Sequence, residues 1–175
     1  MVKYPKIIRV TAAIIESDKK ILIAQRKSDD DIFGGLWEFP GGKKEKNETP
    51  SECLIREIKE EIGINIKDSD LSPITFTSYE YDNFSILLLL FSCREWNGIL
   101  VAKENQELGW FSPLDLYKLE LLPADKGLIE KAVEQDVETS PTWLRLYQLL
   151  PKLIVENEKV KRYLVVIFAG TFIAC

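Results

Sequence analysis

The sequence predicts a mixed α/β (α+β) domain in which helices pack against a central β-sheet. Segments rich in β-branched residues alternate with segments whose apolar residues recur every three or four positions, and these two patterns are typical of strands and of amphipathic helices. The chain has 175 residues, of which 46% are hydrophobic, which is enough to form one core. We expect one domain of ordinary size at residues 1–137 and a helical extension, residues 138–175, packed on it.

Four strands are expected in the first half of the chain. Residues 7–16 and 21–26 are rich in β-branched side chains, and the polar segment 17–20 between them is typical of a hairpin turn. Residues 73–81 and 84–93 predict a second pair of strands, and the second of these is apolar enough to be buried on both faces.

The later elements are shorter or less regular. Residues 98–103 and 108–111 are candidates for short strands, and residues 124–137 have the apolar spacing of an amphipathic helix. A further helix is expected to begin at residues 141–143 and to run to residue 150, because Pro141 is suited to a first helical position and Pro151 interrupts the helix.

The best defined element is a helix from Pro50 to Ile62. Thr49 is expected to cap its first turn, with Glu52 reaching back to the amide of the cap in a capping box. Gly63 is expected to end it.

The composition excludes several kinds of chemistry and of partner. The chain has no histidine, so histidine bases, Ser-His-Asp triads and imidazole metal ligands are excluded. The net charge of −5 gives no general attraction to a nucleic-acid backbone, and no genomic nucleic acid is expected as a partner. The three cysteines lack CxxC spacing and the amino terminus lacks a secretion signal, which favours a cytoplasmic protein. The apolar segment 163–175 is shorter than the roughly 20 residues of a transmembrane helix, so no span is expected.

Three glutamates of the predicted helix are expected to form one acidic patch. Glu57, Glu60 and Glu61 are spaced i, i+3, i+4 and should project from one side, while the apolar residues occupy another. The alternative is a solvated acidic face, but Glu57 and Glu61 repel each other unless a cation lies between them. Such an all-oxygen cluster suits Mg²⁺, with Mn²⁺ as a substitute, and a bound metal would activate water for hydrolysis without histidine.

The segment from Gly42 to Ile64 resembles the Nudix box. Glu48 follows Gly42 by six positions, and the segment closes as REIKEEIGI, residues 56–64, which matches the family pattern throughout. The preceding loop, GGLWEFPGGK, is similar to that of the MutT-type branch of nucleoside triphosphate pyrophosphohydrolases. The resemblance covers residues 7–137 and implies a Nudix α/β/α sandwich with a central mixed β-sheet and a loop-helix-loop box.

The resemblance also implies roles for individual residues. The metal would be held by one carbonyl and several glutamates, namely Gly42, Glu57, Glu60, Glu61, Glu48 as a supporting ligand, and Glu104 from a loop. Arg56 would orient the glutamates. Glu57 and Glu104 are alternatives for the group that activates the attacking water, and Glu60 belongs to the catalytic set. The expected reaction is attack of water on the β-phosphorus of a nucleoside triphosphate, which releases monophosphate and pyrophosphate, by a monomer or a homodimer.

Three residues are candidates for substrate contacts. Arg26 would contact phosphate, and its alternative is a surface charge at a strand end. Phe39 resembles a base-pocket aromatic, and its alternative is a core residue. Asp125 departs from the MutT pattern, which has asparagine there. An ionised Asp only accepts hydrogen bonds, which favours the amino group of cytosine or adenine, and the Pro-Ala-Asp form is similar to the branch that acts on CTP. A helix cap is the alternative for Asp125.

Two other functions are left open by the sequence. Tyr79 and Tyr81 weakly resemble residues of dinucleoside polyphosphate hydrolases. A non-catalytic, nucleotide-binding Nudix module is the other alternative, although such modules usually lose glutamates of the box and this chain retains them all.

Overall fold

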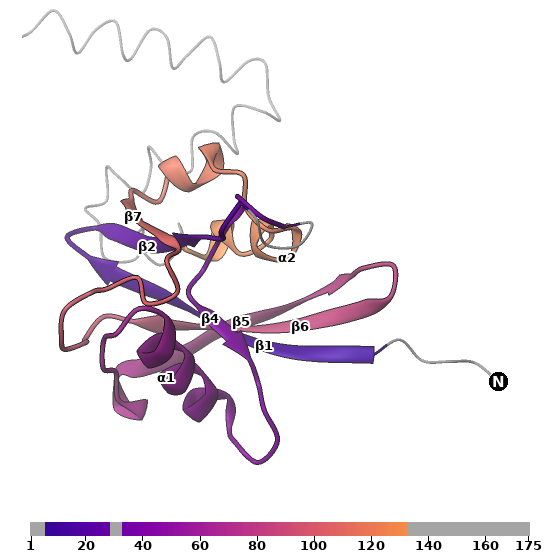
Figure 1. Cartoon of the computed structure of the whole chain (residues 1–175), viewed down its shortest axis with the longest axis horizontal. Helices are drawn as coiled ribbons and strands as arrows, with labels where there is room; N and C mark the ends of the chain where they lie inside the picture. The colour runs from indigo at the N-terminus through magenta and orange to yellow at the C-terminus, as the bar shows by residue number, and fades with distance from the viewer. Residues whose placement is uncertain (1–5, 29–32, 133–175) are drawn as a thin grey trace, which may run out of the picture. The chain divides into compact units, whose positions relative to one another are not determined.

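The computed structural model describes residues 6–28 and 33–132, which form a mixed β-sheet with a helix packed against one face (Figure 1). The strands are β1 (Lys6–Ser17), β2 (Lys20–Gln25), β3 (Trp37–Glu38), β4 (Gly41–Lys43), β5 (Leu71–Glu80), β6 (Phe84–Cys93) and β7 (Glu107–Phe111). The helices are α1 (Pro50–Glu61) and α2 (Pro123–Lys126), with short 3₁₀ turns η1 (Asp68–Asp70) and η2 (Asp115–Lys118). The fold class expected from the sequence is confirmed.

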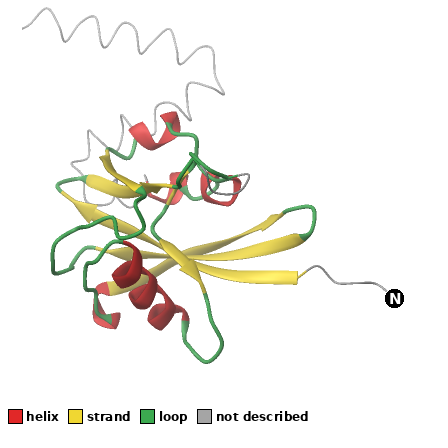
Figure 2. Ribbon diagram, in the orientation of Figure 1, coloured by secondary structure: helices red, strands yellow, loops and turns green. Residues whose placement is uncertain are grey.

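Strand β1 connects the two parts of the sheet. The strand order is β3-β2-β1-β6-β5, with β4 paired to β1 and β7 paired to β2, and Figure 2 shows these strands in yellow. β1 runs parallel to β6 over ten residues and antiparallel to β4 near its middle, but it meets β2 only at the hairpin end. Because β2 turns away from β1 beyond the hairpin, the face of β1 and β6 opposite α1 is left available to line a cavity.

Helix α1 is stabilised by a capping box at its start, by a glycine just after its end and by a row of buried apolar side chains. The side chain of Thr49 accepts a hydrogen bond from the amide of Glu52, and the side chain of Glu52 accepts one from the amide of Thr49, so the predicted capping box is confirmed. Gly63 has a φ of 78°, the left-handed conformation that commonly follows a helix. Cys53, Leu54, Ile58 and Ile62 are all fully buried.

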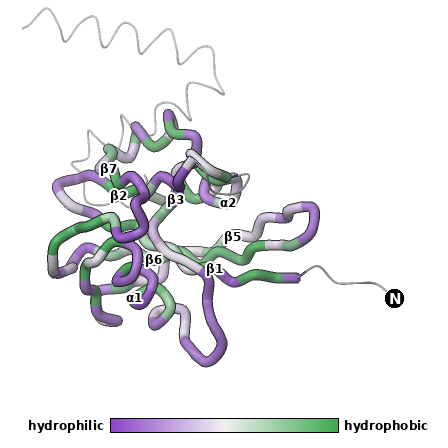
Figure 3. The backbone as a smooth tube through the Cα atoms, in the orientation of Figure 1, coloured by the Kyte–Doolittle hydropathy of each residue, from purple (hydrophilic) through white to green (hydrophobic). Residues whose placement is uncertain are grey.

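The core lies between α1 and the central strands. The stripe of α1 packs with Ala13 and Ile15 of β1 and with Phe91 and Cys93 of β6. The strongly hydrophobic course of β6 is visible in the hydropathy colours of Figure 3. The expectation that β6 is buried on both faces holds for its second half, where residues 90–93 are all buried, whereas residues 84–87 are only partly buried.

Two predicted elements differ from the structure. Residues 98–103 form a loop rather than a strand, because their amides bond to the end of α1: Val101 N donates to the carbonyl of Ile62 at 3.0 Å, and Lys103 N donates to that of Glu61 at 2.8 Å. The helix predicted at residues 124–137 begins at Pro123, but α2 ends at Lys126, and a turn precedes the next helical residues.

Several predictions lie outside the described residues. These are the extension at residues 138–175, the helix at 141–150, the last part of the helix at 124–137 and the apolar segment 163–175. Among the helices of the described ranges, none is long and apolar enough to cross a membrane.

The packing predicts a large difference between two isoleucine substitutions. Ile58→Ala removes side-chain atoms from a fully buried site and should lower the free energy of unfolding by about 2–5 kcal/mol. Ile99, which is 81% exposed, is the matched control, and Ile99→Ala should change it by less than about 0.5 kcal/mol. Urea unfolding of both variants measures this. Equal losses would contradict the described packing of α1.

Candidate active site

A cavity of about 550 Å³ lies on the face of β1 and β6 opposite α1. Apolar side chains of these two strands line it, among them Ile8, Val10 and Ile86. It is also lined by three predicted metal-site residues of the box, Gly42, Glu57 and Glu61, by Glu104, and by the three predicted substrate residues, Arg26, Phe39 and Asp125. The structure therefore brings seven of the predicted site residues to one cavity.

The cavity has an acidic part and an aromatic part that are separated along β1. Gly42 of β4 pairs with Thr11, and Phe84 at the start of β6 pairs with Lys6. Lys6 and Thr11 lie five positions apart along β1, which corresponds to about 16 Å at the usual rise of a strand. This length can accommodate an elongated ligand with one anionic end and one planar end.

Glu57 and Glu61 form the acidic part with the backbone of β4. The carboxylate of Glu57 lies so close to Gly42 that a Cβ atom at this position would collide with it. The amide of Gly41 donates to Oε2 of Glu61 at 3.4 Å. Burial raises the pKa of both carboxyl groups. Burial, together with the negative charges of Glu38, Glu57 and Glu104, raises the pKa of Glu61 to about 8.

Arg56 forms ion pairs with Glu48 and Glu60, which do not line the cavity, and with Glu57, which does. Its guanidinium lies 2.9 Å from Glu48, 2.9 Å from Glu57 and 3.1 Å from Glu60. Hydrogen bonds from Arg56 and from the amide of Glu45 lower the pKa of Glu48 to about 2. Glu60 has a side chain that is 57% exposed. The predicted patch is thus divided: Glu57 and Glu61 line the cavity, while Glu48 and Glu60 pair with Arg56.

The division follows from the helix geometry. Adjacent residues of an α-helix are rotated by about 100° from each other, so Glu60 and Glu61 lie at opposite edges of the side that carries Glu57, and the expectation that all three form one patch fails for Glu60. Since the apolar stripe of α1 is buried, the side that carries Glu57 and Glu61 faces the cavity and the side that carries Glu60 faces outward.

Arg26 forms an ion pair that the sequence analysis did not anticipate. Its Nη1 atom lies 3.3 Å from Oε1 of Glu38. Ala24 pairs with Glu38 across β2 and β3, so Arg26, two residues further on, lies diagonally from Glu38 on the same face of the sheet. Glu38 lines the cavity, and its charge raises the pKa of both Glu61 and Asp125. Alternation along β3 was the sequence signal that could have identified Glu38.

Asp125 is buried at the aromatic part of the cavity. It is 2% exposed, and its Oδ1 accepts a hydrogen bond from the amide of Phe39 at 3.1 Å. Burial raises its pKa to about 7, the bond from Phe39 acts against this shift, and the charge of Glu38 adds to it. The alternative that Asp125 caps a helix is wrong, because the cap of α2 is Leu122 and no side chain bonds there.

Aromatic rings surround this part of the cavity. Tyr81 makes an edge contact with Phe33 at 5.3 Å between ring centroids and stacks on Phe84 at 4.8 Å. All three line the cavity together with Phe39, which is 3% exposed. Phe33 and Phe84 were missed by the sequence analysis, because only the fold brings the two segments together.

The acidic part has the donor chemistry of a site for a hard divalent cation. Its side-chain donors are carboxylate oxygens, and burial and neighbouring negative charges raise the pKa of Glu61, an effect that a bound cation would oppose. Within residues 6–28 and 33–132, no three acidic or cysteine side chains are close enough to form a complete ligand set. The residues fit a metal that is bound together with substrate phosphate and water, as Mg²⁺ commonly is.

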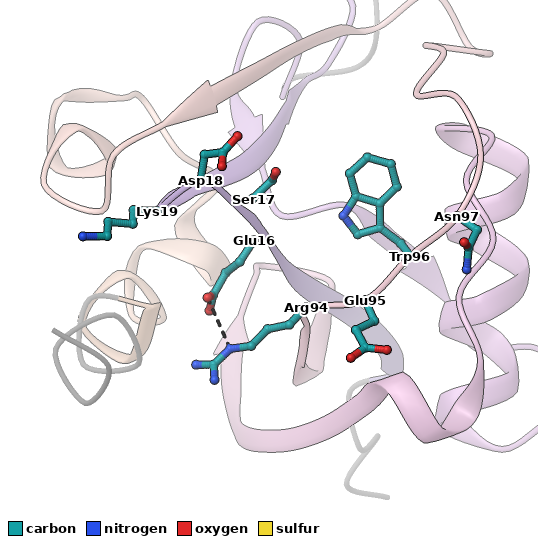
Figure 4. A pocket seen from close by; sticks show the side chains of 8 residues that line it. All are labelled: Glu16, Ser17, Asp18, Lys19, Arg94, Glu95, Trp96 and Asn97. Carbon is teal, nitrogen blue, oxygen red and sulfur yellow. Dashed lines mark ion pairs between the residues drawn. The ribbon is translucent and has the colours of Figure 1, made fainter.

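A second hollow lies at the β1–β2 hairpin (Figure 4). Its walls include Asp18, Trp96 and the ion pair between Glu16 and Arg94, whose charged atoms are 3.3 Å apart. None of the predicted site residues lines it. The cavity over β1 and β6 is therefore the candidate active site.

The sequence of the chain is similar to those of known proteins. Residues 5–133 match the family model described as NUDIX domain. The chain is 41% identical over 125 residues to a CTP pyrophosphohydrolase of Escherichia coli (strain K12), across 71% of this chain and 90% of that protein. It is 30% identical to an 8-oxo-dGTP diphosphatase of the same strain, across 72% and 96%.

The fold of the chain is also similar to that of a solved structure. The solution structure of the E. coli ORF135 protein matches with a TM-score of 0.66 at 38% identity, and the match covers 79% of this chain and 96% of that one. Residues 5–133, which match the family model, include the complete box and the strands that line the cavity. The chain therefore belongs to the Nudix family of hydrolases.

Proposed function

We propose that the protein hydrolyses a nucleoside triphosphate to the monophosphate and pyrophosphate with the help of Mg²⁺, and so removes unwanted nucleotides from the cellular pool. The observation that carries the proposal is the partly buried pair Glu57 and Glu61, which lies beside Gly42 in the same cavity as the aromatic part. The triphosphate would lie over the acidic part and the base among the aromatic rings. The relatives named for CTP and for 8-oxo-dGTP support this class of substrate.

The metal would be held by the carboxylates of Glu57 and Glu61, the carbonyl of Gly42 and, from the loop, Glu104. Bound Mg²⁺, or Mn²⁺ in its place, would supply charge neutralisation at the phosphates and a water of lowered pKa. Glu48 and Glu60 would act through Arg56, which contacts both of them and Glu57. Because Glu57 is bonded to Arg56 and lies against Gly42, we favour Glu104 as the group that accepts the proton of water.

Arg26, which also lines a smaller hollow together with Glu61 and Glu104, would contact the phosphates. Its guanidinium is held by Glu38, and an arginine fixed in this way presents its remaining donors in a defined direction. We also propose that residues 1–137 form the hydrolase domain and that residues 138–175 extend it.

Asp125 would select the base. Its Oδ1 is engaged by the amide of Phe39, so Oδ2 would meet the substrate. The ionised form would accept from the amino group of cytosine, and the protonated form would donate to a guanine carbonyl. With a pKa of about 7, both forms exist near neutral pH. This supports cytosine nucleotides and 8-oxo-dGTP as two substrates of one pocket.

Removal of one cavity carboxylate should abolish most of the activity. Glu57→Gln is expected to lower kcat for dCTP or 8-oxo-dGTP by roughly 10²–10⁴-fold, because the ligand loses its charge while keeping its shape. Glu52→Gln is the matched control on the same helix. Gln also serves in a capping box, and Glu52 does not line the cavity, so this variant should turn over normally. Pyrophosphate release with Mg²⁺ measures both variants, and normal turnover by Glu57→Gln would refute the site.

A wild-type protein that binds these nucleotides but hydrolyses none of them, with Mg²⁺ or Mn²⁺, would favour the non-catalytic module instead. Including diadenosine tetraphosphate and ADP-ribose among the compounds tests the other hydrolase classes.

The preference for the base should depend on pH. Below about pH 7 Asp125 is mainly protonated and above it mainly ionised, so the ratio of kcat/KM for dCTP to that for 8-oxo-dGTP should rise with pH. A change of about tenfold between pH 6 and pH 8 corresponds to one hydrogen bond. Effects of pH on the metal or on Glu61 cancel in the ratio.

Asp125→Asn is the control for this pH dependence. The amide of Phe39 requires an acceptor, so Asn would give it the oxygen and present its NH₂ group to the base. The ratio should then favour 8-oxo-dGTP and should not vary with pH. A pH-dependent ratio in Asp125→Asn, or a constant ratio in the wild type, would contradict the assignment of Asp125.

A further inference from the structure

The side-chain amide of Gln106 joins the two segments that carry the cavity glutamates. Its Nε2 donates to the carbonyl of Glu61, at the end of α1, at 3.0 Å. Its Oε1 accepts from the amide of Glu104, in the loop before β7, at 2.9 Å. Glu61 and Glu104 are 43 residues apart in the sequence. The side chain of Gln106 therefore connects two cavity residues directly through their own backbones.

An amide side chain is suited to both bonds at this position. Its NH₂ group donates to the carbonyl of Glu61 and its oxygen accepts from the amide of Glu104, and one amide group supplies both in one fixed orientation. A carboxylate would lack the donor, and an aliphatic side chain of similar size would lack both. The carbonyl of Glu61 also accepts from Lys103 N, so the end of α1 remains attached to the loop when Gln106 is changed.

The hydrogen bond between Gln106 and Glu104 closes a short turn that begins at Glu104. Asn105 has a φ of 57°, so the chain reverses between Glu104 and Gln106, and the bond from Glu104 N to Gln106 Oε1 closes this turn. Glu104 and Glu61 line the same cavity, and the charge of Glu104 raises the pKa of Glu61. The orientation of the Glu104 backbone thus determines where its carboxylate lies relative to Glu61.

We propose that Gln106 is a positioning residue of the metal site, which fixes Glu104 of the loop against Glu61 of α1 so that both carboxylates reach one metal ion. The inference rests on the proposed function, because it takes these two glutamates as ligands. Gln106 itself contacts neither metal nor substrate. Residues that hold a ligand in place commonly change metal affinity by 10–100-fold when they are substituted.

Binding of Mn²⁺ without any nucleotide tests this proposal. Free Mn²⁺ is followed by electron paramagnetic resonance as the full-length protein is titrated, for the wild type, Gln106→Leu, Glu104→Gln and the double variant. Gln106→Leu should weaken binding about tenfold or more. In the Glu104→Gln background the same substitution should change binding by less than about twofold, because the residue it positions no longer carries a charge.

Gln25→Ala is the matched control. The side chain of Gln25 also donates to a backbone carbonyl, that of Gly35, at 2.8 Å, and Gln25 does not line the cavity. This variant should bind Mn²⁺ as the wild type does. Thermal unfolding of each variant shows whether it is folded at the temperature of the titration. If Gln106→Leu is not folded, Gln106→Asn, which keeps the amide on a shorter side chain that cannot span both bonds, takes its place.

The outcomes separate the proposal from its alternatives. Wild-type Mn²⁺ affinity in Gln106→Leu would overturn it. An equal loss of affinity with and without the charge of Glu104 would also overturn it, since Gln106 would then act through α1 alone. If the wild type binds Mn²⁺ but hydrolyses no nucleotide, the proposed function fails while the positioning of Glu104 is still measured.

Discussion

The site depends on the burial of one stripe of α1 against the central strands. Cys53, Leu54, Ile58 and Ile62 are fully buried, and their removal from water fixes the rotation of the helix about its axis. With the rotation fixed, Glu57 and Glu61 must face β4, and Glu60 must face outward. Hydrophobic packing on one side of the helix thereby sets the position of carboxylates on another.

This arrangement has an electrostatic cost. Carboxylates favour water, and burial beside other carboxylates disfavours their charged form, as the raised pKa values of Glu57 and Glu61 show. Arg56 compensates part of this charge at Glu57 and at the two glutamates outside the cavity. A partly buried acid whose pKa is raised by neighbouring carboxylates, as at Glu61, is what a site prepared for a divalent metal requires.

The parts of the site that the sequence predicted correctly are local in the chain. The capping box, the glycine stop and the rotation of Glu57 and Glu61 depend on residues within one or two helical turns, and the motif spacing contains them. The separation of Glu60 from Glu61 also follows from helix geometry, but the sequence alone did not show which side of α1 would be buried next to β4.

The parts that were missed depend on contacts between distant segments. The ion pair of Arg26 with Glu38 requires the pairing of β2 with β3, and the bridge of Gln106 requires a loop to fold onto the end of α1. The same contact explains the wrong strand at residues 98–103. Ile99 and Val101 have the β-branched character of strand residues, yet they are 81% and 50% exposed, and the loop backbone bonds to the end of the helix instead.

The central claim is that a metal held by Glu57 and Glu61 meets the phosphates while the base lies beside Asp125. A crystal structure with Mn²⁺ and a non-hydrolysable analogue of dCTP, with the metal located by its anomalous scattering, tests it most directly. We expect Mn²⁺ at about 2.0–2.2 Å from carboxylate oxygens of Glu57 and Glu61, with the cytosine amino group within hydrogen-bond distance of Asp125. A metal bound only by Glu48 and Glu60, or a nucleotide in the hollow at the β1–β2 hairpin, would contradict it.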